Sequence, residues 1–198
     1  MQAHIHFLLK SLVIATAIIF SFQKFFPHQS EDICNESRVE TIRVKGNSLT
    51  GLIEDQESLQ FINGAYKCQT PERNDIVVFT SPYHSIPLIK KIYAVPGDLI
   101  EFKEQRGRIH LFINDTELTN SKGEAFSFPS FLSKSLKHEL EKYSGEVPFE
   151  HYLLLGNQFQ GTWDSSRLGF VKKSQLLGKA KKSTMSFSEP MVGHEKSF

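Results

Sequence analysis

The stretch "DIVVFTSPYHSIPLIKKIYAVPGDLIEFKE", residues 75–104, contains three short runs rich in apolar and β-branched residues. The runs cover 75–80, 86–95 and 99–104, and residues typical of turns, including Ser, Pro, Gly and Asp, separate them. Short runs of this kind, bounded by turn residues, are typical of strands that follow one another directly, without crossover helices. The stretch therefore predicts a sheet that is mostly antiparallel.

The same pattern continues on both sides of this stretch. Runs typical of strands recur as "VETIRV" (39–44), "ESLQFI" (57–62), "RIHLFIN" (108–114) and "HYLLLG" (151–156). Between Pro129 and Gly145, leucines spaced by four predict one amphipathic helix over 130–143. We expect a mostly β fold, a coiled antiparallel sheet domain over 39–178 with one inserted helix, followed by a polar, unstructured tail over 179–198.

The N-terminus has the composition of a membrane anchor. The segment "FLLKSLVIATAIIFSFQKFF", residues 7–26, is about 20 residues long, which as a helix is enough to cross a bilayer. A cleaved secretory signal is the alternative, but no small-x-small cleavage site follows the apolar run. We expect an uncleaved transmembrane helix within 1–27 and a polar linker over 28–38. One lysine near each end leaves the orientation undetermined by charge.

Composition excludes two classes of function. The 198-residue chain has a formal net charge of +1 and no basic stripe interleaved with aromatic residues, so we expect no nucleic-acid partner. The eight histidines and two cysteines show none of the spacings that metal sites require, so we expect neither a metal nor a cofactor.

Two adjacent lysines in the run 86–95 are candidates for catalysis. Side chains alternate between the faces of a strand, so Lys90 and Lys91 point to opposite sides and one of them points inward. Burial lowers the pKa of a lysine, which makes it a usable general base, and a serine paired with such a lysine is a known nucleophile. Ser48, in the turn "GNSL", is the candidate nucleophile. The alternatives are an ordinary turn serine and a snorkelling lysine pair.

Four segments in order resemble the blocks of the type I signal peptidases, a family that includes pilin-processing relatives of conjugative transfer. The segments are "GNSL" (46–49), "NDIVVF" (74–79), "IKKIYAVPGD" (89–98) and "GNQFQGTWDSSRLGFV" (156–171). The resemblance implies Ser48 as nucleophile, Lys90 as general base and Lys91 at the adjacent basic position. It further implies Thr162 as a hydroxyl partner of the base, Asp164 as a supporting carboxylate and Gly46 in the turn that leads to the serine.

The chain departs from the family pattern near the supporting carboxylate. Ser166 occupies the column of an arginine that normally pairs with the aspartate, and Arg167 is displaced by one position. Two arrangements stay open: Arg167 reaches Asp164 from its shifted position, or serine hydroxyls hold Asp164. Leu49 also stands where the family has methionine.

The resemblance implies an enzyme that removes signal peptides from exported preproteins, single-pass in the bacterial inner (cytoplasmic) membrane, with its catalytic domain on the periplasmic or outer side. The lipid bilayer and the preproteins are then its partners. We expect the cleaved segment to add as a strand between two strands of the enzyme. The Ser48 amide, helped by the turn at Gly46, is expected to stabilise the oxyanion. The expected substrate-binding residues are Ile42, Val44, Ile86 and Leu88.

Other functions are compatible with parts of the sequence. A specialised peptidase that matures one pilin-like substrate shares every motif, and an inactive membrane-tethered β module that binds exported peptides shares the fold. A self-cleaving repressor shares the Ser/Lys chemistry but carries a DNA-binding domain where this chain has an apolar segment. If the domain faces an oxidising exterior, Cys34 and Cys68 form a disulfide; two unpaired thiols are the alternative.

Overall fold

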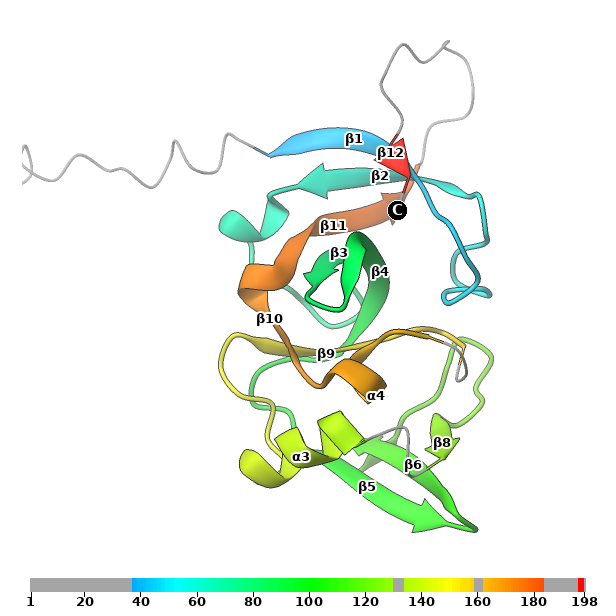
Figure 1. Ribbon diagram of the computed structural model, residues 1–198, viewed down its shortest axis with the longest axis vertical. Helices are drawn as coiled ribbons and strands as arrows, with labels where there is room; N and C mark the ends of the chain where they lie inside the picture. Colours follow the sequence, from blue (N-terminus) through cyan, green and yellow to red (C-terminus); the bar gives the residue numbers. More distant parts are fainter. Residues whose placement is uncertain (1–36, 130–133, 159–161, 184–195, 198) are drawn as a thin grey trace, which may run out of the picture. The chain divides into compact units, whose positions relative to one another are not determined.

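The computed structural model describes residues 37–129, 134–158, 162–183 and 196–197 (Figure 1). The predicted anchor over 1–27 and nearly all of the predicted linker lie outside these residues. Within them, no helix is long and apolar enough to cross a membrane.

The larger of two sheets has eight strands in the order β10-β9-β4-β3-β11-β2-β1-β12. Every neighbouring pair is antiparallel except β1 and β12, which run parallel. The strands are β1 (Arg38–Arg43), β2 (Ser58–Asn63), β3 (Ile76–Ser81), β4 (His84–Ala94), β9 (His151–Leu155), β10 (Val171–Lys172), β11 (Leu176–Lys182) and β12 (Lys196–Ser197).

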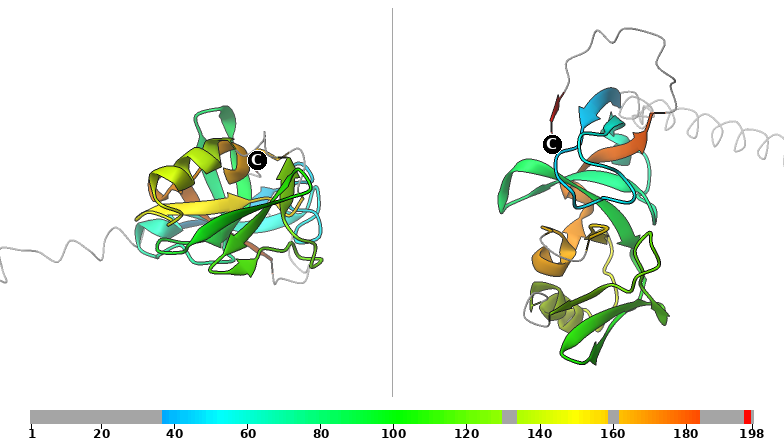
Figure 2. Two further views of the ribbon diagram at one scale, coloured as in Figure 1. Left: turned by 90° about the horizontal axis from the view of Figure 1, so that it is seen from below. Right: turned by 90° about the vertical axis from the view of Figure 1, so that its right-hand side faces the viewer.

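The second sheet is built around β6 and lies at the opposite end of this part of the chain from β1 and β2 (Figures 1 and 2). Leu136 and Leu140 of the helix α3 are buried in the core that this sheet shares with β9. The elements are β5 (Ile100–Gln105), β6 (Arg108–Ile113), β7 (Thr116–Glu117), β8 (Ser127–Pro129) and α3 (Lys134–Lys142), with a four-residue helix α4 (Ser165–Leu168) and the 3-10 turns η1 (Ala65–Lys67) and η3 (Lys173–Gln175) elsewhere.

The prediction of a mostly β, antiparallel fold is confirmed. Each of the seven predicted strands is present, with ends within two residues of those expected. The predicted helix is α3, which begins at Lys134, and residues 130–133 lie outside the described part of the chain.

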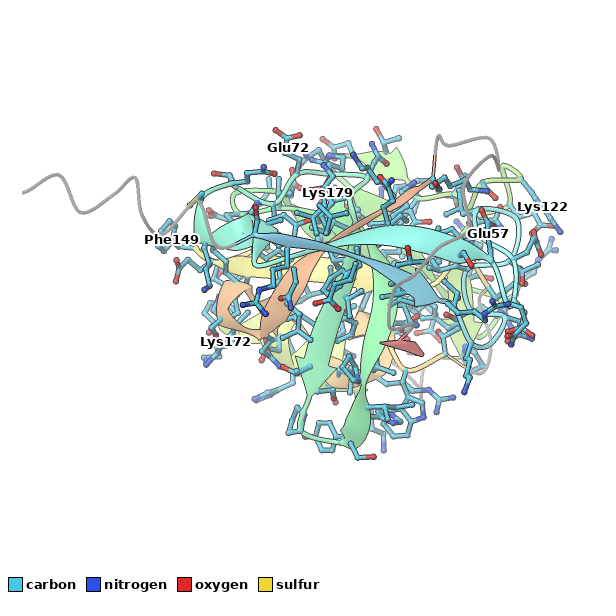
Figure 3. All side chains as sticks on the ribbon, turned by 90° about the horizontal axis from the view of Figure 1, so that it is seen from above. Glu57, Glu72, Lys122, Phe149, Lys172 and Lys179 are labelled. Carbon is cyan, nitrogen blue, oxygen red and sulfur yellow. The ribbon has the colours of Figure 1, made fainter. Side chains whose placement is uncertain are left out.

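The prediction of an unstructured tail over 179–198 is wrong for residues 179–182 and 196–197, which belong to β11 and β12. Strand β11 continues to Lys182 and lies between β2 and β3. Gly178 and Ala180 are buried, whereas the lysines between and after them are more exposed. Buried and exposed positions thus alternate as in a strand, but the many lysines make the segment look like a polar tail. Lys179 (Figure 3) also reaches back to Asp75, with 2.6 Å between its Nζ and Oδ1.

Strand β4 lies inside the larger sheet with apolar side chains packed on both faces. Val78 and Ile89 belong to one core cluster, whereas Phe79 and Ile92 belong to another. Burial on both faces explains why the run 86–95 is almost continuously apolar. Of the two lysines in this strand, Lys90 is buried and Lys91 is partly exposed.

Candidate active site

A compact loop between β1 and β2 presents Ser48. Val44 N donates to Glu57 O at 3.0 Å and Gln56 N donates to Val44 O at 2.9 Å, which closes the loop at its base. Leu49 and Ile53, on the loop itself, are buried in the core below β1 and β2. Since Leu49 directly follows Ser48, burial of its side chain fixes where the serine hydroxyl can point.

Strand β4 brings Lys90 to this hydroxyl. Lys90 is only 4% exposed, and its Nζ donates to Ser48 Oγ at 2.9 Å and to Ile89 O at 2.8 Å. The two residues are 42 positions apart in the chain, so the sheet creates this contact. The prediction that one lysine of the pair points inward is confirmed, because Lys91 is more exposed than Lys90.

The surroundings of Lys90 lower the pKa of its ammonium group. Burial lowers the pKa of Lys90 from its ordinary value to about 8, and the negative charge of Asp164 acts in the opposite direction. Near-neutral pKa values suit a general base, because the neutral amine is then available at working pH and still basic enough to accept a proton. The serine and the lysine thus have both the geometry and the proton affinity of a nucleophile and its base.

Asp164 is buried below the dyad and fully supplied with hydrogen-bond donors. Ser166 donates to its Oδ1 from both N (3.0 Å) and Oγ (2.6 Å), and Gly156 N donates to its Oδ2 at 3.1 Å. The Thr162 hydroxyl also donates to Oδ2. Through the Ser166 amide, Asp164 caps the N-terminus of α4, which satisfies a backbone donor that a short helix leaves unpaired.

Of the two arrangements left open for Asp164, the structure contains the one with hydroxyl groups. Hydroxyl groups hold Asp164, whereas the described residues contain no ion pair between Asp164 and Arg167. The Arg167 guanidinium instead lies 5.5 Å from the centre of the Trp163 ring, which forms a T-shaped pair with His84 at 4.6 Å between ring centroids. The expected bond from the Thr162 hydroxyl to Lys90 is replaced by its bond to Asp164. In this arrangement Thr162 acts on Lys90 through the carboxylate.

We predict that Asp164 is energetically coupled to Ser166 and not to Arg167. Hydrogen bonds to a charged group contribute about 1.5–3 kcal/mol, so a double-mutant cycle of Asp164→Asn with Ser166→Ala should give a coupling of about 1 kcal/mol or more in the free energy of unfolding. The matched cycle with Arg167→Ala should give less than about 0.5 kcal/mol. Urea denaturation measures both, and a larger coupling in the Arg167 cycle would contradict the assignment.

Asn157 connects the serine loop to the rest of the site, a role that was not predicted from the sequence. Its backbone N donates to Ser48 O at 2.6 Å, and its side-chain amide donates to Thr50 O at 2.7 Å. Its Oδ1 accepts from Ser121 N at 3.0 Å. The neighbouring Gly156 packs so close that a Cβ there would meet Ser48 O at 2.7 Å. The only sequence signal was the position of "GN" in the block 156–171.

The turn at Gly46 was expected to help stabilise the oxyanion, but its amide is hydrogen-bonded within the loop. Gly46 has a φ of 96°, which favours glycine, and its N donates to Asp55 Oδ1 at 2.7 Å. Its amide is thus already engaged and holds the loop in shape. Among the hydrogen bonds of the described residues, the Ser48 amide has no acceptor.

The four residues expected to bind substrate fall into two groups. Ile42 and Val44 are buried in the core, so their side chains are not available at the surface. On β4, Ile86 is 58% exposed, and Leu88 is half-buried.

Cys68, just after η1, is disulfide-bonded. No free thiol occurs in the part of the chain that the structure describes. The predicted partner, Cys34, lies outside the described residues.

Comparison with known proteins identifies the family of the chain. Residues 5–185 match the family described as signal peptidase, peptidase S26. The chain belongs to this family. It is therefore a serine endopeptidase of the signal peptidase type, as its motifs predicted.

Individual members of the signal peptidase family resemble the chain at low identity. Signal peptidase IB of Staphylococcus aureus (strain COL) is 26% identical over 195 residues, which cover 90% of this chain and 88% of that protein. Signal peptidase I of Buchnera aphidicola subsp. Schizaphis graminum (strain Sg) is 28% identical over 176 residues, covering 62% of this chain and 56% of that longer relative. The crystal structure of a signal peptidase I from Enterococcus faecalis V583 has a TM-score of 0.41 and 26% identity, covering 56% of this chain and 97% of that one.

Proposed function

We propose that this signal peptidase removes signal peptides from exported preproteins, with Ser48 as nucleophile and Lys90 as general base. The observation that carries the proposal is the 2.9 Å contact between Ser48 Oγ and the buried Nζ of Lys90. The neutral amine of Lys90 takes the proton from Ser48, whose oxygen attacks the carbonyl carbon of the scissile bond. Protonated Lys90 then gives this proton to the departing amine, leaving an ester on Ser48.

The second half of the reaction uses the same two residues. Lys90, neutral again, takes a proton from a water molecule that attacks the ester, and the proton returns to Ser48 as the acid product leaves. In both steps negative charge develops on the former carbonyl oxygen. The Ser48 amide, which has no acceptor among the described residues, is the donor we assign to this oxygen. Asn157 supports this role because it holds the carbonyl of the same residue.

The substrate is proposed to bind as an added strand. In the described part of the chain, β9 pairs with β4 only over its second half, so the edge of His84–Lys90 that faces away from β3 has no neighbouring strand. Strand β1 accepts β12 in parallel at Ile42 and Arg43, which supports the view that its outer edge accepts an extended segment. Ile42 and Val44 would then contribute backbone, and Ile86 and Leu88 side chains.

Location and partners follow from the same proposal. The segment 1–27 would hold the enzyme in the bacterial inner membrane as a single span, in the same bilayer as the signal peptides it cuts. Confinement to one bilayer raises the effective concentration of enzyme and substrate for each other. The disulfide at Cys68 supports an exterior, oxidising location of the catalytic domain.

The experiment is cleavage of a purified preprotein by the full chain in detergent micelles. We expect a cut after a small residue, identified by mass spectrometry of the new N-terminus. Replacing the small residue before the cut by leucine should lower kcat/KM by at least about tenfold, because we expect the larger side chain to keep the scissile carbonyl away from Ser48. Equal rates for both substrates would contradict the proposal. Cleavage confined to a pilin precursor would favour the specialised peptidase, and absence of any cleavage would favour the inactive peptide-binding module.

A further inference from the structure

A turn over residues 120–124, between β7 and β8, is held in a defined shape by its first residue. Asn120 Oδ1 accepts from Lys122 N at 2.9 Å and from Glu124 N at 3.0 Å, and Asn120 Nδ2 donates to Glu124 Oε2 at 2.8 Å. At the base of the turn, Thr119 and Ala125 form an antiparallel bridge. The side chain of Asn120 thus replaces the backbone bonds that a longer hairpin would supply.

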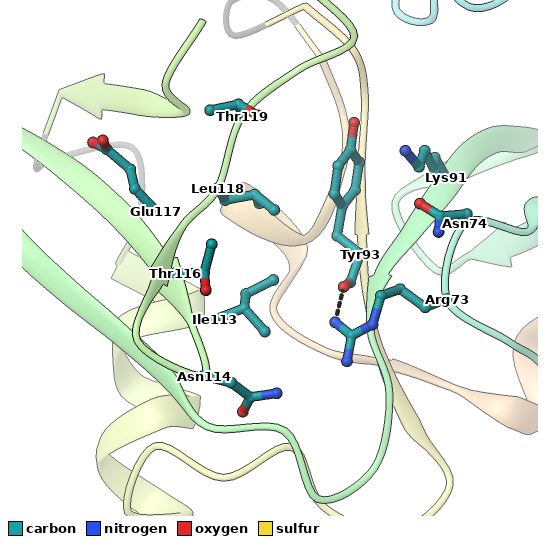
Figure 4. A pocket seen from close by; sticks show the side chains of 10 residues that line it. All are labelled: Arg73, Asn74, Lys91, Tyr93, Ile113, Asn114, Thr116, Glu117, Leu118 and Thr119. Atoms are coloured by element: carbon teal, nitrogen blue, oxygen red, sulfur yellow. Dashed lines mark hydrogen bonds between the residues drawn. The ribbon is translucent and has the colours of Figure 1, made fainter. Parts of the chain in front are cut away.

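The second sheet carries this turn. Leu118 N donates to Leu111 O and Phe126 N donates to Leu118 O, both at 2.8 Å, and Leu111 and Phe126 are buried in the core of that sheet. Residues 116–119, which lead into the turn, line one wall of a cavity of about 420 Å³, and Lys91 and Tyr93 of β4 line the facing wall (Figure 4). The segment therefore faces a cavity before the turn, and it contacts the Ser48 loop beyond it.

Ser121, in this turn, binds both ends of the Asn157 carboxamide. Its N donates to Asn157 Oδ1 at 3.0 Å, and its Oγ accepts from Asn157 Nδ2 at 2.8 Å. The same Nδ2 donates to Thr50 O at 2.7 Å. Since a backbone N–H faces one end of the carboxamide and a backbone carbonyl faces the other, only this orientation of the amide satisfies both.

The three segments are in direct contact at this point. Asn157 is fully buried, and a Cβ added at Gly51 would meet Asn157 Nδ2 at 2.9 Å and Ser121 Oγ at 3.1 Å. The serine loop therefore approaches both residues as closely as a glycine allows. A buried polar network in which each member has its partners defines one geometry, because any other arrangement leaves a donor or an acceptor unpaired.

We propose that Ser121 is a positioning residue for Ser48, through which the second sheet holds the serine loop in its reactive conformation. Ser121 fixes the carboxamide that holds Thr50 O, and the backbone N of Asn157 holds Ser48 O at 2.6 Å. The backbone is thereby held on both sides of Leu49, and with it the direction of the serine hydroxyl. The proposal rests on the proposed function in taking Ser48 as the nucleophile. A displacement of about 1 Å at a reacting group costs about 10²-fold in rate.

The first test is Asn157→Asp, which keeps the shape of the side chain and replaces its NH₂ group by oxygen. Assays at pH 9 keep Lys90 neutral and the new carboxyl group ionised, so that an acceptor faces the acceptor Thr50 O. We expect kcat for preprotein cleavage by the full chain in detergent micelles to fall at least about tenfold. KM should change less than about threefold, because the strand edges proposed to bind substrate are untouched.

The second test is Ser121→Ala, which keeps the backbone donor and removes only the hydroxyl that accepts from Asn157. We expect kcat to fall about three- to tenfold, again with little change in KM. The matched control is Ser127→Ala, because the Ser127 hydroxyl also accepts a bond in the second sheet, from Arg108 Nε at 3.0 Å. Its kcat should stay within about twofold of wild type.

Asn114→Asp is the matched control for the carboxamide. Asn114 Oδ1 accepts from Leu99 N and its Nδ2 donates to Asp98 Oδ1, both at 2.8 Å, so the change again turns a donor into an acceptor that faces an oxygen. These bonds lie outside the serine loop. We expect Asn114→Asp to lower Tm and to leave kcat within about twofold of wild type, which separates loss of stability from loss of positioning.

Hydrogen exchange provides a readout that does not depend on cleavage. The amides of Thr50, Leu52 and Ile53 donate within the serine loop, so they report how firmly the loop is held. In a fragment that covers 46–53, exchange followed by mass spectrometry should be at least about threefold faster in Asn157→Asp and Ser121→Ala than in wild type. Both control variants should exchange at the wild-type rate in this fragment.

Faster exchange of the loop together with a lower kcat in both test variants supports the proposal. Unchanged exchange over 46–53, an unchanged kcat, or equal losses of kcat in the control variants would overturn it. A wild-type chain that cuts no preprotein would contradict the proposed function, whereas faster exchange in the two test variants would still support the hold of the turn on the serine loop. The two proposals therefore fail in different measurements.

Discussion

Replacing Lys90 by methionine will lower kcat/KM for preprotein cleavage by at least about 10³-fold. The side chain of methionine fills nearly the same volume but has no group that can take the proton from Ser48. Because methionine also removes a buried ammonium, we expect the variant to stay folded, with unchanged circular dichroism. The matched control is Lys103→Met on β5, where a half-exposed lysine lies against Phe112; its activity should stay within about twofold of wild type.

Ser48→Ala should produce a loss of the same size, and the double variant should be no worse than either single variant. Residues that act as one unit in catalysis are strongly non-additive, because removing either one disables the step that both perform. Activity of Lys90→Met near that of wild type, or losses that multiply in the double variant, would exclude Ser48 and Lys90 as a dyad.

The second large effect is on pH dependence. Only the neutral form of Lys90 accepts a proton, and its pKa is about 8. The value of kcat/KM should therefore rise about tenfold per pH unit below pH 8 and level off above it, so that activity at pH 6 is about 1% of the plateau. Single-turnover assays in buffers of constant ionic strength measure this profile. A flat profile between pH 5 and 9 would contradict a lysine base.

The same shift predicts how stability changes with pH. The pKa of Lys90 is lower in the folded chain than the ordinary value of 10.5, so between about pH 8 and 10.5 the unfolded chain binds more protons and the free energy of unfolding rises with pH. Below pH 8 the cost of the buried charge is present in full, about 3 kcal/mol. Lys90→Met has no buried charge at this position and lacks this cost. The difference in unfolding free energy between wild type and Lys90→Met should therefore shrink as the pH rises from about 8 to 10.5.

Sequence patterns predicted the strands that alternate or are continuously apolar, because burial leaves a direct record in residue type. Strand β11 was missed because its inward positions after Leu176, Gly178 and Ala180, are small. Gly178 packs so tightly that a Cβ would meet Ile62 O at 2.1 Å, and the lysines around it are typical of a solvated tail. Local composition contains no information about how close a neighbouring strand will come.

The dyad was predictable because each member has a local signal, a serine in a glycine turn and a lysine in an apolar strand. The supporting residues have no such signal. Ser166 holds Asp164 because α4 begins at that point, and Arg167 one position later points to Trp163. Asn157 acts on Ser48 through its backbone, where residue type says little. These roles depend on register and on contacts between distant segments, which only the folded chain defines.

The hydrogen bond from Asn157 to Thr50 has a consequence for biosynthesis. It joins residues 107 positions apart, so the contacts of the Ser48 loop with Asn157 form only after the block 156–169 has been synthesised and has folded against the loop. A ribosome-bound or partly translocated chain that stops earlier has the serine and the lysine but not the carboxylate at position 164 or the amide that fixes the serine loop. With Ser48 and Lys90 as the proposed dyad, we expect such a chain to be inactive as a protease until its domain is nearly complete.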